Sequence, residues 1–221
     1  MKVFHLPEKI EALAFDMDLT LYSNREYAQY QIDSLVERLG KRRGLSFPEM
    51  NREVEEARKI WALSHNGVRP SLTDILCDYG ISMEENISWH EIFEPGNFLK
   101  EDKSLKAALE QLSHFYVLGL ITNNSILTAR KTLAALGVGD CFSILVGLDT
   151  CMKPKPHKEP FVKFLELSNC PLKSCVSIGD RYDIDLSVPL EMGMGGILVD
   201  GAEDVYGLPE LLLKKGGNYG V

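Results

Sequence analysis

Positive charge, long apolar runs and cysteine are all scarce in this 221-residue chain. Lys and Arg total 24 against 32 Asp and Glu, so the formal net charge is −8, which argues against binding of a nucleic-acid polymer through a basic face. Uncharged apolar stretches such as residues 116–121 are far too short to cross a bilayer. No long apolar segment follows Lys2, so a secretory leader is not expected. We therefore expect a cytoplasmic protein with neither nucleic acid nor membrane as its partner.

The cysteines do not form a recognisable framework. There are five of them, an odd number, and no Cys-x-x-Cys pair occurs. This excludes a disulfide-stapled miniprotein and leaves no complete cysteine zinc site. We expect reduced thiols.

The rest of the composition is that of an ordinary globular protein, with 45% hydrophobic and 25% charged residues. An apolar strand is predicted at 10–15. From residue 102 onwards, short apolar segments alternate with amphipathic ones, so strands separated by helices are predicted at 115–121, 143–146, 175–178 and 196–199. Such alternation is typical of a parallel sheet with helices on both faces.

The segment between the first predicted strand and residue 96 has a different pattern. Apolar residues recur at helical spacing over 25–40, 47–63 and 72–79, without a convincing strand. The sequence therefore predicts an α/β core formed by residues 1–22 and 96–221. Residues 23–95 are predicted to form a helical insertion after the first strand.

Polar side chains gather where the predicted strands end. Ligands of open parallel sheets bind beyond the carboxyl ends of the strands, so a site is expected there. Taken alone, each cluster could be a turn former, a helix cap or a surface lysine. Their recurrence at four strand ends favours one shared site. The residues are Asp16, Asp18, Thr20, Thr122, Asn123, Lys153, Lys155, Asp180 and Asp185.

Asp16 and Asp18 would repel each other without a cation between them, and Asp180 adds a third carboxylate. Hard oxygen ligands of this kind suit Mg²⁺, which readily takes a phosphate oxygen as a further ligand. The hydroxyl of Thr122 and a lysine ammonium could bind the remaining phosphate oxygens. The cluster therefore predicts phosphoryl transfer at a magnesium site.

Such chemistry needs a nucleophile, and a carboxylate can serve by forming an aspartyl phosphate. Asp16 lies closest to the rigid strand end and is the predicted nucleophile. Asp18, two residues further, can protonate the leaving group and then activate the water that hydrolyses the intermediate. Thr20 belongs to the same cluster and is expected to contact the phosphate.

Four segments with these residues follow one another at 15–21, 118–123, 155–161 and 176–185. The first reads Phe-Asp-Met-Asp-Leu-Thr-Leu, the second is an apolar strand ending in Thr-Asn, the third joins Lys-Pro to a later Phe, and the fourth contains Gly-Asp followed by an acid. In this order they resemble the four motifs of the haloacid dehalogenase-like (HAD) superfamily. The resemblance implies a Rossmann-like core with a helical cap inserted after the first strand.

The resemblance also implies a role for each matching residue. Asp16 matches the nucleophile and a metal ligand, and Asp18 matches the general acid/base, whose backbone carbonyl also binds Mg²⁺. Thr122 and Asn123 match the phosphate-binding turn. Asp180 matches the remaining side-chain ligand of the metal.

Two further matches concern the lysine of the third motif. Asp185 matches an acid that supports the metal shell or the lysine from outside. The lysine itself is either Lys153 or Lys155; the spacing to Phe161 favours Lys155, and Lys153 remains open.

We therefore expect a Mg²⁺-dependent phosphatase that acts on a small phosphorylated metabolite. The motif details are similar to the pyrimidine 5′-nucleotidase-like branch, which favours a nucleoside 5′-monophosphate; a phosphoglycolate or sugar phosphatase is the near alternative, and a phosphomutase is less favoured. A receiver-like phosphorylation switch and a non-catalytic HAD-like phosphate-binding protein are the alternatives from other classes. The oligomeric state stays open.

Substrate choice is expected to fall to the helical insertion, because only about 28 residues separate the second motif from Lys153, too few for a second large cap. Trp61, His65, Asn66 and Arg69 lie at or near a predicted helix end and are candidates for contact with the leaving group.

Overall fold

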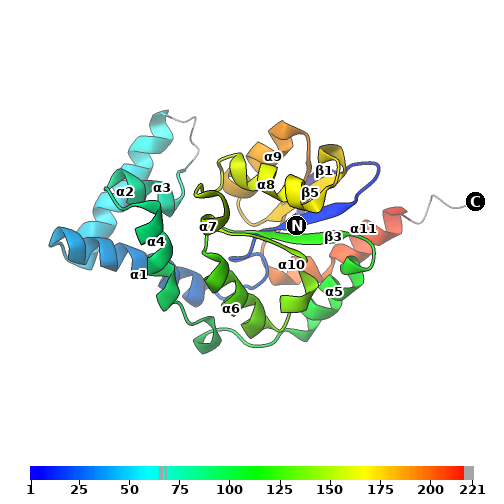
Figure 1. Cartoon of the computed structure of the whole chain (residues 1–221), viewed down its shortest axis with the longest axis horizontal. Coiled ribbons are helices and arrows are strands. Elements are labelled where there is room, and N and C mark those ends of the chain that lie inside the picture. Colours follow the sequence, from blue (N-terminus) through cyan, green and yellow to red (C-terminus); the bar gives the residue numbers. More distant parts are fainter. Residues whose placement is uncertain (65–66, 68, 217–221) are drawn as a thin grey trace, which may run out of the picture.

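The computed structural model describes residues 1–64, 67 and 69–216 and contains a six-stranded sheet with helices on both faces (Figure 1). The strands are β1 (Lys2–His5), β2 (Ala12–Phe15), β3 (Val117–Ile121), β4 (Ile144–Val146), β5 (Cys175–Gly179) and β6 (Gly195–Leu198). Their order is β1-β6-β5-β2-β3-β4, and every neighbouring pair except β1 and β6 is parallel. The predicted α/β class is confirmed, and the five predicted strands end within two residues of their expected positions.

The edge strand β1 was not predicted. All four of its residues are exposed, so it lacks the apolar run that identifies the other strands. It pairs antiparallel with β6, with Val3 opposite Ile197. Strand β2 is therefore the second strand in chain order and the first of the parallel ones, and the helical insertion follows it.

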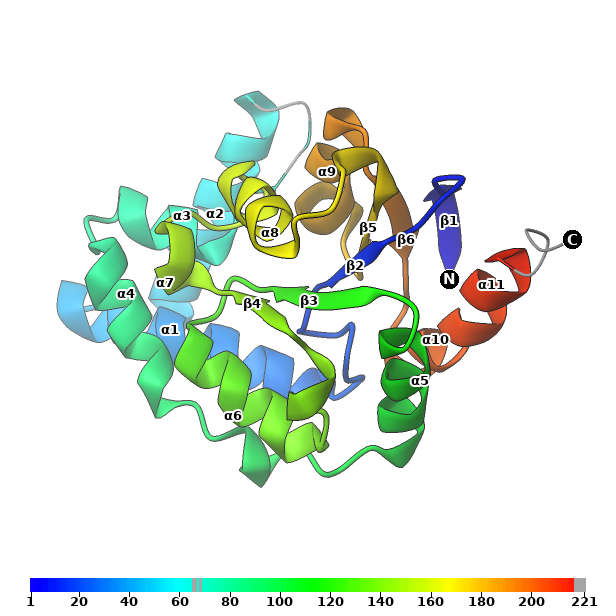
Figure 2. The same cartoon turned by 45° about the vertical axis from the view of Figure 1, so that its right-hand side comes forward.

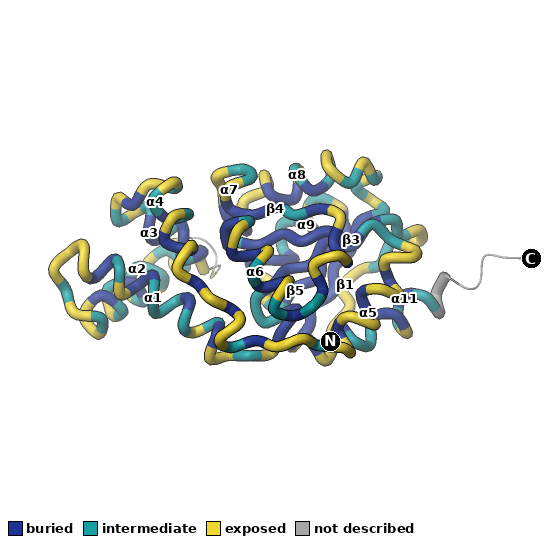
Figure 3. The backbone as a smooth tube through the Cα atoms, turned by 60° about the horizontal axis from the view of Figure 1, so that its bottom comes forward, coloured by how far each residue is buried: buried dark blue, intermediate teal, exposed yellow. Residues whose placement is uncertain are grey.

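Strand β2 lies at the centre of the sheet, between β3 and β5. Alternate side chains of a strand point to opposite faces, and here both faces are covered. Leu13 and Phe15 pack with one set of helices, while Ala12 and Ala14 pack with the other (Figure 2). The first set is α5 (Lys103–Ser113), α6 (Ile126–Leu136), α10 (Ala202–Tyr206) and α11 (Leu208–Gly216); the second is α8 (Glu159–Ser168) and α9 (Ser187–Met192). In Figure 3 the sheet accordingly stands out as a deeply buried layer.

The helices that follow β2 pack around an apolar core of their own, at the left of Figure 1. They are α1 (Arg25–Arg43), α2 (Phe47–Ser64), α3 (Leu72–Asp78) and α4 (Met83–Trp89), and we refer to them as the helical unit. Leu39, Met50 and Ile75 are central to its core. Helix α1 begins at Asn24, whose side chain accepts from the Tyr27 amide, and ends at Gly44, whose φ of 71° suits glycine. The expected helices are present, the short α4 was not predicted, and the domain boundaries stay a prediction.

Two sets of contacts join the helical unit to the sheet domain. On one side, Thr128 in α6 donates to the carbonyl of His90, and Lys131 donates to the carbonyl of Phe93. On the other side, the amide of Arg69 donates to Asp183, and the ring of His157 is hydrogen-bonded to Asp74 in α3. Between these sides, the helical unit faces the carboxyl ends of the parallel strands. No helix within the described ranges has the length and apolar character needed to span a membrane.

Candidate active site

The turn after β2 directs two carboxylates to the carboxyl edge of the sheet. The Asp16 amide donates to the Ile178 carbonyl at 2.8 Å, so Asp16 continues the pairing of β2 with β5. The Leu21 amide then donates to the Met17 carbonyl at 2.9 Å, which closes a tight turn. Within it Leu19 has a φ of 58°, a left-handed conformation that is uncommon for leucine and often found at functional sites.

A buried lysine joins the first of these carboxylates to a third one. The Lys155 Nζ donates to Asp16 Oδ1 at 2.5 Å and to Asp185 Oδ1 at 2.8 Å. The second oxygen of Asp185 accepts from the Arg181 amide at 3.0 Å. Gly179 permits this close approach, because a Cβ there would lie 2.4 Å from that of Asp185. The structure therefore places Asp185 against the lysine. By contrast, Lys153 is exposed.

The charges of this cluster are not balanced. Burial raises the pKa of Asp16 to about 6, although the Lys155 ammonium opposes the effect. Burial and the neighbouring Asp16 and Asp185 carboxylates raise the pKa of Asp180 to about 8. Burial by itself would lower the pKa of Lys155, but the carboxylates of Asp16 and Asp185 outweigh it and raise that pKa, so the ammonium form is retained. The Arg181 guanidinium, whose Nε lies 3.9 Å from Asp180 Oδ1, is a second cation of the cluster, but the carboxylates of Asp16, Asp180 and Asp185 still outnumber the two cations.

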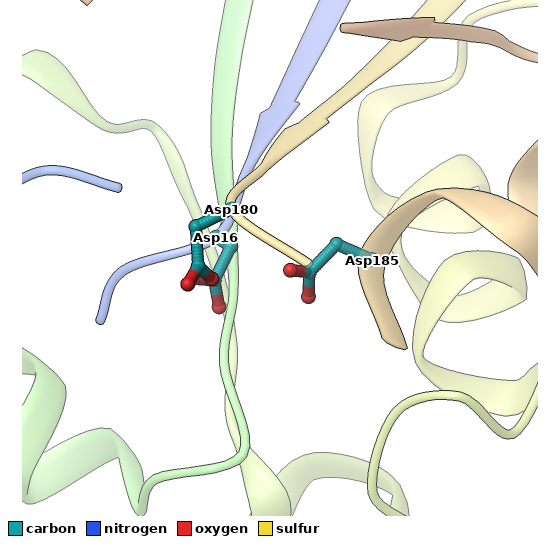
Figure 4. Close-up of side chains that lie close together, drawn as sticks. All are labelled: Asp16, Asp180 and Asp185. Carbon is teal, nitrogen blue, oxygen red and sulfur yellow. The ribbon is translucent and has the colours of Figure 1, made fainter. Parts of the chain in front are cut away.

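The residues present fit a divalent cation. One oxygen each of Asp16, Asp180 and Asp185 lie within 4.8 Å of one another, and the three side chains converge in Figure 4. Both oxygens of Asp185 already accept hydrogen bonds, whereas Asp180 Oδ1 is buried without a hydrogen-bond partner in the described part of the chain. Oxygen ligands and missing positive charge suit Mg²⁺. Asp180 is therefore the side chain with a buried oxygen that lacks a hydrogen-bond donor among the described residues, and Asp16 lies beside it, with both oxygens accepting from Lys155 and Thr20.

Asp18, the second carboxylate of the turn, is held by three donors. Its Oδ1 accepts from the Tyr22 hydroxyl at 2.5 Å and from Gln31 Nε2 at 3.0 Å, and its Oδ2 accepts from Asn124 Nδ2 at 2.8 Å. Gln31 also donates to the Tyr22 hydroxyl. None of these three donors to Asp18 was predicted from the sequence. Tyr22 and Asn124 adjoin recognisable motifs, but Gln31 comes from α1, thirteen residues away, and no local pattern indicates it.

Thr20, Thr122 and Asn123 were predicted to contact phosphate, and the structure gives their side chains protein partners. Thr20 is fully buried and donates to Asp16 Oδ2 at 3.1 Å. The Asn123 side chain accepts from the Lys155 amide at 2.6 Å and donates to its carbonyl at 3.0 Å. The Thr122 hydroxyl accepts from the Asn124 amide. Thr20 thus positions Asp16, and Asn123 positions Lys155. These two positioning roles were not predicted from the spacing of the sequence motifs.

A cavity of about 240 Å³ lies between these carboxylates and the helical unit. Asp18 and Asp180 line it from the sheet domain, and Arg58 and His90 line it from the other side. Neither Arg58 nor His90 was predicted.

The contacts predicted for the helical insertion with the leaving group stay a prediction. Arg69 bonds through its amide to Asp183, and Trp61 is partly buried in α2. His65 and Asn66 lie outside the described residues.

Residues 13–199 match the family described as haloacid dehalogenase-like hydrolase. This match agrees with the fold and with the arrangement of the acidic residues described above. The chain belongs to this family. A phosphoglycolate phosphatase from Shigella boydii is 25% identical over 96% of this chain and 84% of its own length.

Solved structures of HAD proteins share the fold. An HAD phosphatase from Thermococcus onnurineus has a TM-score of 0.58 at 21% identity and covers 86% of both chains. The HAD hydrolase YfnB from Bacillus subtilis, bound to magnesium, has a TM-score of 0.57 at 16% identity, covering 91% of this chain and 99% of its own. At these identities the likeness concerns the HAD fold.

Proposed function

We propose that this HAD hydrolase is a Mg²⁺-dependent phosphatase that cleaves a small phosphate monoester through an aspartyl phosphate on Asp16. The observation that carries the proposal is the contact of buried Lys155 with Asp16, beside an oxygen of Asp180 that has no hydrogen-bond partner in the described part of the chain. The phosphatase names of the Shigella and Thermococcus proteins support the reaction class, and the magnesium of YfnB supports the metal.

The residues divide the reaction between them. Mg²⁺, held by Asp16, Asp180 and the Asp18 carbonyl, would offset the charge of the phosphate oxygens. In the first half-reaction, a carboxylate oxygen of Asp16 forms a bond to phosphorus while the bond to the ester oxygen breaks. Asp18 gives that oxygen a proton. The Lys155 ammonium offsets the charge that builds up on the phosphoryl group.

In the second half-reaction, Asp18 takes a proton from water as the water oxygen bonds to phosphorus. The bond between phosphorus and Asp16 breaks, which releases phosphate and restores the carboxylate. Retention of both Asp16 and Asp180 favours this enzyme over a non-catalytic phosphate-binding protein.

The test is phosphate release from p-nitrophenyl phosphate. We expect turnover with Mg²⁺, no turnover after EDTA treatment, and recovery when Mg²⁺ is added back. Equal rates in EDTA and Mg²⁺, or no turnover under either condition with folded protein, would contradict the proposal.

Replacing Gln31 by Leu should slow the proton transfers that involve Asp18. The substitution removes one of three hydrogen bonds that orient its carboxylate, from a residue that is 6% exposed. An alkyl phosphate needs a proton on its leaving oxygen far more than a nitrophenyl ester does. We expect kcat to fall about tenfold for the alkyl ester and much less for the nitrophenyl ester.

The matched control is Gln29→Leu, an exposed position on the same helix where Gln29 bonds to Asp33. It should leave both rates unchanged. If Gln31→Leu slowed both esters equally, Gln31 would act on the shape of the site and not on proton transfer.

A further inference from the structure

Arg181, which directly follows Asp180, has a fixed backbone and a free side chain. Its amide donates to Asp185 Oδ2 at 3.0 Å, and its carbonyl accepts from the Asp185 amide at 2.8 Å. These two bonds hold the point from which the side chain extends. The side chain is 53% exposed, and the one ionic contact of its guanidinium within the described ranges joins Nε to Asp180 Oδ1 at 3.9 Å. Such a side chain can change rotamer while its backbone stays in place.

The contact between Arg181 and Asp180 is weak. A separation of 3.9 Å is too long for a hydrogen bond, and an ion pair that is half exposed to water usually contributes little to stability. Lys155 is different, because it is 2% exposed and donates to two carboxylates at 2.5 and 2.8 Å. The acidic cluster therefore has one cation that is held firmly and one that can be exchanged.

Asp180 Oδ1 is also the oxygen that a divalent cation would use. It is buried without a hydrogen-bond partner among the residues described, and it lies beside Asp16 (Figure 4). A divalent cation bound there would occupy this oxygen and repel the guanidinium, since both are positively charged. Mg²⁺ and Arg181 thus compete for one carboxylate.

The cavity beside the carboxylates offers Arg181 a second partner. Arg181 lines this cavity together with Asp18 and Asp180, on the side of the sheet domain. A phosphoryl group bound at the carboxylates would bring several acceptor oxygens to this wall. The planar guanidinium of arginine is suited to two parallel hydrogen bonds with such oxygens. A guanidinium released from Asp180 would therefore find an anion close by.

We infer that Arg181 is an exchangeable counter-ion, which pairs with Asp180 in the absence of metal, leaves it when Mg²⁺ binds, and then binds the phosphoryl group. The inference rests on the proposed phosphatase function and adds a residue that couples metal binding to phosphate binding. Mg²⁺ and phosphate both favour the arrangement in which the guanidinium faces the cavity. Each should therefore strengthen the binding of the other beyond their direct attraction.

The first experiment is a calorimetric titration with Mg²⁺ in the absence of phosphate. Arg181→Gln should bind Mg²⁺ about twofold to fivefold more tightly than the unmodified protein, because the competing half-exposed cation is gone. The matched control is Arg130→Gln, the same change at an exposed arginine of α6, which should leave the affinity unchanged. Equal or weaker Mg²⁺ binding by Arg181→Gln would show that Arg181 does not compete for Asp180.

The second experiment repeats the titration in saturating inorganic phosphate, with Mg²⁺ added to phosphate alone as the blank. Phosphate should tighten Mg²⁺ binding to the unmodified protein, and in Arg181→Gln this tightening should be smaller by about fivefold or more. Arg181→Lys should restore part of it, and Arg130→Gln should keep all of it. The unfolding midpoint of each variant shows whether it is folded. Equal tightening in the unmodified protein and in Arg181→Gln would overturn the exchange.

The two hypotheses fail differently. Turnover of p-nitrophenyl phosphate, with the same coupling of Mg²⁺ and phosphate in the unmodified protein and in Arg181→Gln, overturns the role of Arg181 and leaves the phosphatase intact. Absence of turnover, with a coupling that Arg181→Gln weakens, overturns the phosphatase and leaves the exchange. A folded protein that binds no Mg²⁺ overturns both.

Discussion

The Asp16→Asn protein should lose phosphate release by at least about 10⁴-fold and still fold. The amide cannot form the acyl phosphate, so the two-step reaction is blocked at its first bond. Because burial raises the pKa of Asp16 to about 6, the charged form is costly to bury, and a neutral amide is compatible with the fold. Steady-state rates and urea unfolding of the same preparation test both statements.

A trapping experiment makes the same point directly. Acid-quenched wild-type enzyme exposed to labelled substrate should carry label that hydroxylamine removes, as expected for an acyl phosphate, and Asp16→Asn should carry none. Asp140→Asn is the matched control, since Asp140 is exposed and precedes β4 at the opposite end of the sheet. Full activity of Asp16→Asn would end the assignment of the nucleophile.

Replacing Lys155 by Met should damage both stability and activity. Its side chain is 2% exposed and its ammonium contacts two buried carboxylates, so the substitution leaves Asp16 and Asp185 without this cation. Breaking a buried ion pair on one side typically costs about 3–5 kcal/mol of unfolding free energy. Removal of a group that stabilises transition-state charge typically lowers kcat by about 10²–10³-fold.

Lys153→Met separates the two lysines that the sequence left open. Lys153 is exposed, and substitutions at such positions usually change stability by about 0.5 kcal/mol or less. Urea unfolding with and without Mg²⁺, together with kcat on one substrate, should show a large effect at Lys155 and almost none at Lys153. The reverse result would move the catalytic lysine to Lys153.

The sequence predicts the sheet and the acidic cluster because both depend on local patterns. A parallel strand buried on both faces is a continuous apolar run, and its carboxyl end adjoins those of its neighbours. Asp16 and Asp180 could therefore be placed together although they are 164 positions apart in the sequence. The same reasoning missed β1, because an exposed edge strand has no such run.

The side chains of the helical unit were harder to predict. Gln31, Arg58 and His90 reach the site only through the packing of α1, α2 and the segment after α4 on the sheet domain, and helical periodicity does not specify that packing. Thr20 and Asn123 were predicted to contact phosphate, which stays a prediction, while their hydrogen bonds to Asp16 and Lys155 were not foreseen. Motif spacing locates a residue at a strand end without showing whether its side chain faces ligand or protein.

The contacts of the helical unit with the sheet domain are more buried on one side than on the other, and this has a mechanical consequence. Near the two places where the chain passes between the sheet domain and the helical unit, which we call the chain crossings, the Asn24 side chain donates to the Phe98 carbonyl. On the same side, the buried Thr128 hydroxyl donates to the His90 carbonyl. The bonds of Arg69 to Asp183 and of Asp74 to His157 are exposed. A hinge axis through the crossings would break these exposed bonds first and withdraw Gln31 from Asp18 in the same rotation. The opening that lets the product leave would then also remove the hydrogen bond of Gln31 from Asp18, the residue that transfers the proton.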